Sequence, residues 1–157
     1  METRFDLFGS DLMTTFIRRF NGASQVAGES ALPKAVQELV KLRASQINGC
    51  GMCTDMHTKD ALAAGESQTR LSLVAAWRDA TVFTEAERAA LALAEEGTRL
   101  ADAHTGVSDD VWQAARKHYD DEQLAALIAV IAVINAWNRL NVIAGTPAGD
   151  YEPGMFG

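Results

Sequence analysis

The chain has 157 residues, of which 48% are apolar and 22% charged, proportions typical of a single soluble globular domain with its own core. Its 21 acidic and 14 basic residues give a formal net charge of −7, and the basic residues form no run or stripe, which argues against nucleic acid or a membrane surface as a partner. The first residues, METRFDLFGSDL, include acidic side chains and no apolar core segment. They do not resemble a signal peptide, and we expect a cytoplasmic protein.

Hydrophobic residues recur with helical spacing along nearly the whole chain, and no strand pattern occurs, which predicts an all-α fold. Pro33 suits a first helical turn, Gly65 suits a helix C-terminus, and Thr84 to Glu87 has the form of a capping box. In chain order, the expected helices span about 11–20, 33–48, 50–64, 67–77, 84–100, 108–119 and 120–143. No repeat or linker divides these helices, so one domain over residues 1–157 is expected.

Two features near the C-terminus point beyond a monomer. The run from Leu124 to Ile134 is apolar on every face, which predicts a helix that is central or shared between subunits. Its eleven residues are too few to span a bilayer, which needs about 20. The tail, residues 144–157, is rich in Gly and Pro yet contains Tyr151, Met155 and Phe156. Disorder and an arm packed on a neighbouring subunit are both open for it.

The chain has two cysteines, Cys50 and Cys53, and His57 follows four residues later. Residues three apart in a regular helix have Cβ atoms about 5–6 Å apart, whereas a disulfide needs about 3.5–4.5 Å. Cys50 must therefore lie at or before the first turn of a helix, and Gly49 and Gly51 allow such a bend. The free N–H groups and the dipole of a helix start favour a thiolate.

These residue types can carry redox chemistry. His57 projects to the same side as both thiols, so it can accept a thiol proton or, as imidazolium, stabilise a thiolate. A thiolate attacks a peroxide and becomes a sulfenic acid, with which the second thiol condenses to a Cys50–Cys53 disulfide. An external dithiol then reopens the disulfide by exchange. A slow-turnover redox-sensing or binding protein is the alternative outside enzyme chemistry.

Two further interpretations of the cysteine pair are open. Zinc binds Cys and His, but a structural zinc site needs a fourth ligand, and the chain has no second CxxC and no HxxxH. His104 and His118 stand alone and are more typical of solvated surface residues. The other interpretation is a pair of inert buried thiols, although the neighbouring glycines suit a turn better than a packed core.

Glu38, eleven further residues and then Cys50-x-x-Cys53-x-x-x-His57 match the pattern E-x11-C-x-x-C-x-x-x-H. The chain thus resembles the AhpD-like alkylhydroperoxidases of the carboxymuconolactone decarboxylase superfamily. Four further stretches carry the same resemblance, namely LVKLRASQINGC, HTKDALAAGES, AWRDATVFTEAERAALALAE and INAWNRLNV. The resemblance implies a helical bundle with its core over about 33–142, assembled as trimers, hexamers or related oligomers. It also implies thiol-dependent reduction of organic or hydrogen peroxide, with no cofactor other than an external dithiol reductant, such as a lipoyl or thioredoxin-type protein.

By the same resemblance Cys53 is the peroxidatic cysteine, Cys50 the resolving cysteine, and His57 and Glu38 form a proton relay. Physical chemistry alone leaves the order of the thiols open, because the helix start favours Cys50 while contact with His57 favours Cys53. Without the family pattern, Glu38 is more typical of a solvated helix face. Met52 departs from the pattern, because it stands where these peroxidases have a histidine and cannot relay a proton. The intact cysteine pair argues against the decarboxylase branch, which typically lacks it.

Two other groups of residues have no predicted catalytic role. The three tryptophans could line a substrate pocket, but core or interface packing is the more common role of such side chains. The segment NAWNRLN places Asn135, Asn138 and Arg139 near the end of an apolar helix. Helix termination or an intersubunit contact are the available explanations for them.

Overall fold

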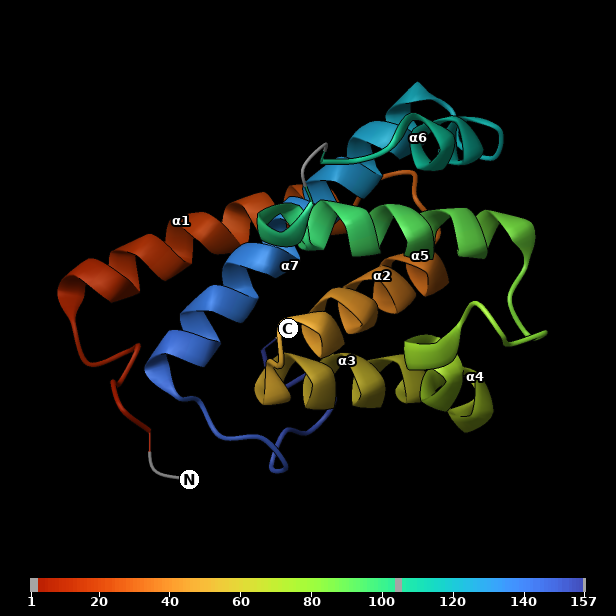
Figure 1. Cartoon of the computed structure of the whole chain (residues 1–157). Coiled ribbons are helices and arrows are strands. Elements are labelled where there is room, and N and C mark those ends of the chain that lie inside the picture. Colours follow the sequence, from red (N-terminus) through yellow and green to blue (C-terminus); the bar gives the residue numbers. More distant parts are fainter. Residues whose placement is uncertain (1–2, 104–105, 157) are drawn as a thin grey trace.

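The computed structural model describes residues 3–103 and 106–156, and every regular element within these ranges is helical. This confirms the all-α class, and His104 lies outside the described residues. The elements, in chain order, are α1 Asp11–Gly28, α2 Lys34–Ile47, α3 Gly51–Ala63, α4 Gln68–Leu73, η1 Val74–Ala76, α5 Glu85–Thr98, η2 Leu100–Asp102, α6 Asp109–Arg116 and α7 Asp121–Ala144 (Figure 1).

Local signals set most helix starts. Side-chain oxygens of five N-cap residues accept a hydrogen bond from a backbone N–H in the first turn, namely Ser10, Ser67, Thr84, Ser108 and Asp120. Thr84 forms the capping box with Glu87 that its sequence predicts. At the other end of the chain, Gly145 has φ +69° and closes α7. These contacts involve near neighbours in sequence, which is why most helix starts follow from the sequence so closely.

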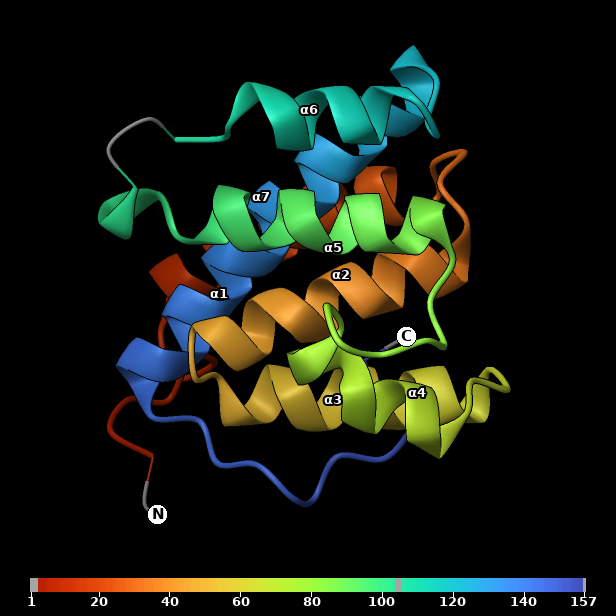
Figure 2. The same cartoon turned by 45° about the vertical axis from the view of Figure 1, so that its right-hand side comes forward.

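The helix α2 lies at the centre of the molecule. It packs against α3, α5 and α7, and in Figure 2 α5, α2 and α3 run as successive layers with α7 crossing behind them. The main core lies where α2, α5 and α7 meet and includes Val40, Leu93 and Leu127. A smaller cluster joins the start of α3 to α7 and contains both cysteines with Ala44 and Ile134. The thiols are therefore held in packed structure.

The helix α7 is central, as its composition predicts. By length and composition it could cross a membrane, with a mean hydropathy of 1.6 over 18 residues, but core helices of soluble proteins share these properties. It contacts α1, α2, α3, α5 and α6. Its apolar faces are unequally covered, because Leu127 and Ile134 are buried while Ile128 is 54% exposed.

The N-terminal helix is longer than predicted. α1 continues to Gly28, about two turns beyond the expected end near Phe20. Gly22 lowers the helical propensity of this segment, but Ala27 is buried in the main core. Tertiary packing at Ala27 therefore extends the helix past a residue that the sequence marks as unfavourable.

The C-terminal segment is not disordered, because it lies along α3 of its own chain, and its packing on a neighbouring subunit stays a prediction. Asp55 Oδ2 accepts a hydrogen bond from Gly149 N–H at 2.8 Å, and Lys59 Nζ donates to the carbonyl groups of Gly149 and Tyr151, both at 2.8 Å. Tyr151 is buried, and its hydroxyl donates to Asp60 at 2.8 Å. Polar side chains on the outer face of α3 thus hold the segment, and Phe156 at its end stays exposed.

Candidate active site

The turn between α2 and α3 determines where Cys50 lies. Gly49 adopts φ +65°, its N–H donates to the carbonyl of Gln46 at 3.3 Å, and Cys50 N–H donates to the carbonyl of Ser45 at 3.0 Å. These two bonds form a Schellman motif, which ends α2. Cys50 then serves at once as the N-cap of α3, with extended backbone angles of −83° and 98°. The prediction that Cys50 precedes the first helical turn is confirmed.

Both cysteines are free thiols, and both are almost fully buried. The Cys53 thiol donates a hydrogen bond to Cys50, and this bond is the largest cause that lowers the pKa of Cys50 to about 7. Burial opposes the shift, and the Cys53 backbone N–H adds to it. The same contact, together with burial, raises the pKa of Cys53. The pair therefore loses its first proton readily and its second with difficulty. This order agrees with the argument from the helix start, which favours a thiolate at Cys50.

Glu38 lies beside His57 because α2 and α3 pack side by side. Its Oε2 lies 2.8 Å from His57 Nδ1, and its Oε1 lies 2.8 Å from Lys41 Nζ. Burial alone would favour the neutral acid, but the hydrogen bonds and charges of His57 and Lys41 outweigh it and lower the pKa of Glu38 to about 2. Glu38 is thus a partly buried carboxylate that orients an imidazole, and its interpretation as a solvated residue, made without the family pattern, is wrong.

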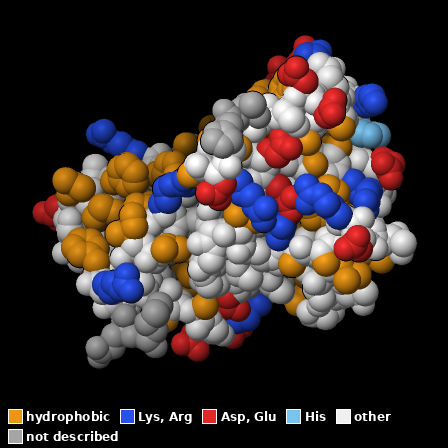
Figure 3. Space-filling model, in the orientation of Figure 1, with side chains coloured by type: hydrophobic (Ala, Val, Ile, Leu, Met, Phe, Trp, Pro, Cys, Tyr) orange, Lys and Arg blue, Asp and Glu red, His pale blue; other side chains and the backbone are white. Residues whose placement is uncertain are grey.

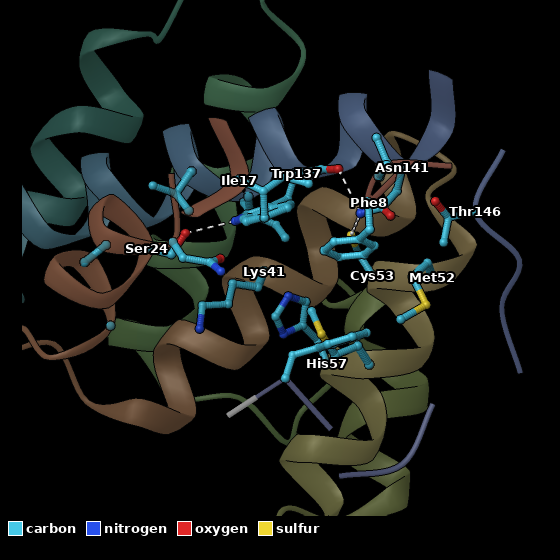
Figure 4. Close-up of a pocket in the computed structure, with 18 of the residues that line it drawn as sticks. Phe8, Ile17, Ser24, Lys41, Met52, Cys53, His57, Trp137, Asn141 and Thr146 are labelled. Atoms are coloured by element: carbon cyan, nitrogen blue, oxygen red, sulfur yellow. Dashed lines mark hydrogen bonds between the residues drawn. The ribbon is translucent and has the colours of Figure 1, made fainter. Parts of the chain in front are cut away.

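A mostly apolar cavity of about 530 Å³ opens beside Cys53 and His57 (Figure 4). Met52 and Trp137 line it, and Phe8, from the segment before α1, also contributes a wall. Cys50 does not line this cavity; it faces a separate, open hollow bounded by Gly49, Gly51, Asp55 and the C-terminal segment. The two cysteines therefore line different hollows, and Cys53 is the one that a ligand in the apolar cavity would meet.

The structure also assigns positions to residues that the sequence left without a role. Trp137 lines the cavity, and its Nε1 donates to Ser24 Oγ at 2.9 Å, whereas Trp77 and Trp112 pack in or against the core. Asn135 and Asn138 are buried nine and six residues before the last residue of α7, Ala144, so they do not terminate the helix. Their spacing of three residues is the signal that could have placed both side chains on one face.

The described residues contain no group of three or more Cys, His, Asp or Glu side chains arranged to hold a metal ion. The zinc interpretation thus finds no additional ligand near Cys50, Cys53 and His57 in this part of the chain. His57 Nδ1 is instead hydrogen-bonded to Glu38. The four signature residues are brought together as an acid–base pair beside two thiols.

Comparison with known proteins agrees with this arrangement. Residues 11–96 match the family model described as the carboxymuconolactone decarboxylase family. The chain is 38% identical over 120 residues to the uncharacterized protein YdfG of Bacillus subtilis, covering 76% of this chain and 80% of YdfG. It is also 44% identical over 75 residues to the alkyl hydroperoxide reductase AhpD of Rhodopseudomonas palustris, covering 45% of this chain and 41% of that protein.

Among solved structures, a protein of Agrobacterium tumefaciens, ATU0492, superposes with a TM-score of 0.88 at 32% identity. The match covers 96% of this chain and all of the other, and ATU0492 is described as a protein of unknown function and a suggested antioxidant defence protein AhpD. The shared fold extends over nearly the whole length of both chains.

Proposed function

Because the chain belongs to the carboxymuconolactone decarboxylase family, we propose that it is a thiol-dependent peroxidase acting through a Cys50–Cys53 disulfide. One observation carries the proposal. Two free thiols in contact lie at a helix start, and one of them, Cys53, opens on an apolar cavity beside a His57–Glu38 pair. Relatives described as alkyl hydroperoxide reductases support the same chemistry.

In the first step, the Cys53 thiolate attacks the terminal oxygen of a hydroperoxide. A sulfur–oxygen bond forms as the O–O bond breaks, so sulfur is oxidised to a sulfenic acid and the peroxide is reduced. His57, which has received the thiol proton, returns it to the leaving alkoxide, and the alcohol departs. Glu38 holds Nδ1 of His57 and balances the imidazolium charge, which leaves Nε2 for this proton transfer.

In the second step, Cys50 attacks the sulfur of the Cys53 sulfenic acid. The S–S bond forms as the S–O bond breaks, and the hydroxide leaves as water with the proton that Cys50 gives up. Once Cys53 is oxidised, its thiol no longer donates to Cys50, and it is the position of Cys50 at the start of α3 that favours the attacking thiolate. An external dithiol, of the lipoyl or thioredoxin type, then reduces the disulfide by exchange.

The apolar lining of the cavity favours an organic hydroperoxide over hydrogen peroxide, because apolar groups of the substrate would be buried there. We further propose a homo-oligomer. Large hydrophobic side chains are exposed on α1, among them Leu12 and Phe16, and Ile143 near the end of α7 is 73% exposed. Figure 3 shows apolar side chains gathered over α1, and patches of this kind mark subunit contacts in many proteins.

The proposal is tested by counting thiols. The reduced protein is alkylated before and after one equivalent of cumene hydroperoxide and weighed by mass spectrometry. Two alkylated cysteines should become none, and a Cys53→Ser variant should form no disulfide. If both cysteines remain alkylatable after exposure to peroxide, the proposal fails.

A second measurement separates an enzyme from a redox sensor. With a dithiol such as dihydrolipoamide in excess, an enzyme consumes many equivalents of hydroperoxide, whereas a sensor is oxidised once and stalls. Elemental analysis of the same preparation tests the zinc interpretation, which requires one metal ion per chain.

A further inference from the structure

One face of α7 presents three asparagines to the turn between α2 and α3. Asn135, Asn138 and Asn141 follow each other at intervals of three residues, so their side chains lie on one side of the helix. Asn48, in the turn, donates from Nδ2 to Asn135 Oδ1 and to Asn138 Oδ1, both at 2.9 Å. The first two asparagines thus fasten the turn that carries Cys50 to α7.

The third asparagine reaches a sulfur atom directly. Asn141 Nδ2 lies 3.5 Å from Cys53 Sγ, and it also donates to the carbonyl of Trp137 at 3.1 Å. Figure 4 shows the amide pointing from α7 toward Cys53 at the wall of the cavity. The bond to the Trp137 carbonyl fixes the amide, so the N–H is held toward the sulfur.

The side chains of α7 do not lower the pKa values of the two thiols equally. Beyond the mutual contact of the thiols and their burial, Asn138 lowers the pKa of both Cys50 and Cys53, whereas Asn141 lowers the pKa of Cys53 alone. The mutual contact by itself places the charge on Cys50 and the proton on Cys53. Attack from the apolar cavity requires the opposite distribution, because Cys53 is the sulfur that lines it.

We propose that Asn141 is a catalytic residue that selects Cys53 as the attacking sulfur, by donating its amide N–H to the Cys53 thiolate. When the proton shared by the two thiols passes from Cys53 to Cys50, this N–H stabilises the negative charge that forms at the wall of the cavity. During peroxide reduction the same N–H stays on the sulfur as the S–O bond forms and the O–O bond breaks. The role in turnover rests on the proposed peroxidase function, but the choice between the sulfurs does not.

The test measures which cysteine reacts, without any peroxide. Reduced protein is treated with less than one equivalent of iodoacetamide, and the ratio of label at Cys53 to label at Cys50 is read from peptide masses. A hydrogen bond to a charged group contributes about 1.5–3 kcal/mol, so Asn141→Leu should lower this ratio by about tenfold or more. Asn21→Leu, which changes another residue lining the same cavity, should leave the ratio unchanged.

A ratio that stays within about twofold of wild type in Asn141→Leu would overturn the proposal, since a hydrogen bond to a charged group is expected to change it about tenfold or more. Asn141→Asp, which keeps the size of the side chain and adds a charge that opposes the thiolate, should lower the ratio further. If these variants do not fold, the side-chain amide signal of Asn141 is followed by NMR as the first thiol ionises. The amide signal of Asn141 should shift when Cys53 ionises in Cys50→Ser and should stay fixed when Cys50 ionises in Cys53→Ser. The reverse result contradicts the proposed contact of Asn141 with the Cys53 thiolate.

Peroxide assays then separate this proposal from the peroxidase function. If wild type reduces no hydroperoxide but Asn141→Leu still redirects alkylation, the peroxidase function fails and the selection of Cys53 stands. If wild type is an active peroxidase but Asn141→Leu leaves the ratio of Cys53 to Cys50 alkylation unchanged, the peroxidase function stands and the selection of Cys53 by Asn141 fails.

Discussion

Glu38 Oε2 lies 2.8 Å from His57 Nδ1, although the two residues are 19 positions apart in the chain and belong to different helices. The contact joins a carboxylate on α2 to an imidazole on α3, one turn of helix away from Cys53. Lys41 shares the same carboxylate through its other oxygen. Because Glu38 touches His57 and neither thiol, it acts as a positioning residue.

Glu38→Gln should slow peroxide reduction while the protein remains folded. The amide still accepts a hydrogen bond from His57, but the charge that balances the imidazolium is lost. We expect kcat/KM for cumene hydroperoxide to fall about 100-fold. Glu85→Gln, which changes an exposed carboxylate in the first turn of α5, is the matched control and should retain full activity. Equal rates in the two variants would show that the relay does not pass through Glu38.

The same carboxylate makes stability depend on pH. The folded pKa of Glu38, about 2, lies below its ordinary value of 4.5, since contacts with His57 and Lys41 outweigh burial. Its contribution is fully present above pH 4.5 and is lost as the pH falls toward 2, because the unfolded chain binds the proton first. The full contribution is of the order of 3 kcal/mol. The difference in unfolding free energy between wild type and Glu38→Gln should shrink by that order over this range in urea titrations. A constant difference would contradict it.

Removing Cys53 should make Cys50 less acidic. The hydrogen bond from the Cys53 thiol is the largest cause of the lowered Cys50 pKa, about 7, and it stabilises the thiolate. In Cys53→Ala the midpoint of the pH–rate profile for alkylation of Cys50 should rise by about one pH unit or more, toward the ordinary value of about 8.5. A midpoint that stays near 7 would mean that the helix start alone sets the acidity of Cys50.

Met52→His should raise the rate of peroxide reduction. Met52 lines the cavity immediately before Cys53, at the position where the alkylhydroperoxidase pattern that the sequence resembles has a histidine. We expect an increase of about tenfold in kcat, since a positioned acid–base group contributes at least that much. Met56→His places an imidazole one turn later on the same cavity wall and should give no increase.

Asp55→Ala should loosen the C-terminal segment without unfolding the domain. It removes the acceptor for Gly149 N–H and the ion pair with Lys59. Hydrogen exchange of residues 147–151 should become faster in mass-spectrometric measurements, while the unfolding free energy falls by about 1 kcal/mol or less, as for surface ion pairs. Unchanged exchange would show that the segment is held by Tyr151 instead.

Much of the architecture could be predicted from the sequence. The capping box at Thr84, the glycine turn before Cys50 and the periodic helices involve residues close together in the chain, so they follow from local chemistry. Cys50, Cys53 and His57 could be selected from their spacing, whereas Glu38 could be recognised only as part of a family pattern. The roles of these four residues in turnover stay predictions.

What the sequence determined by itself was local: helical class, helix starts, and a bondable thiol pair placed at a turn. The tertiary structure decided which distant side chains meet that pair. Asn141 reaches Cys53 across 88 residues, and Lys59 holds Tyr151 across 92. Such contacts depend on how whole helices pack, since a polar side chain looks alike in sequence whether its helix face meets water or a sulfur atom. The same physical reason explains why Asn141 and the cavity beside Cys53 could be found only in the folded chain.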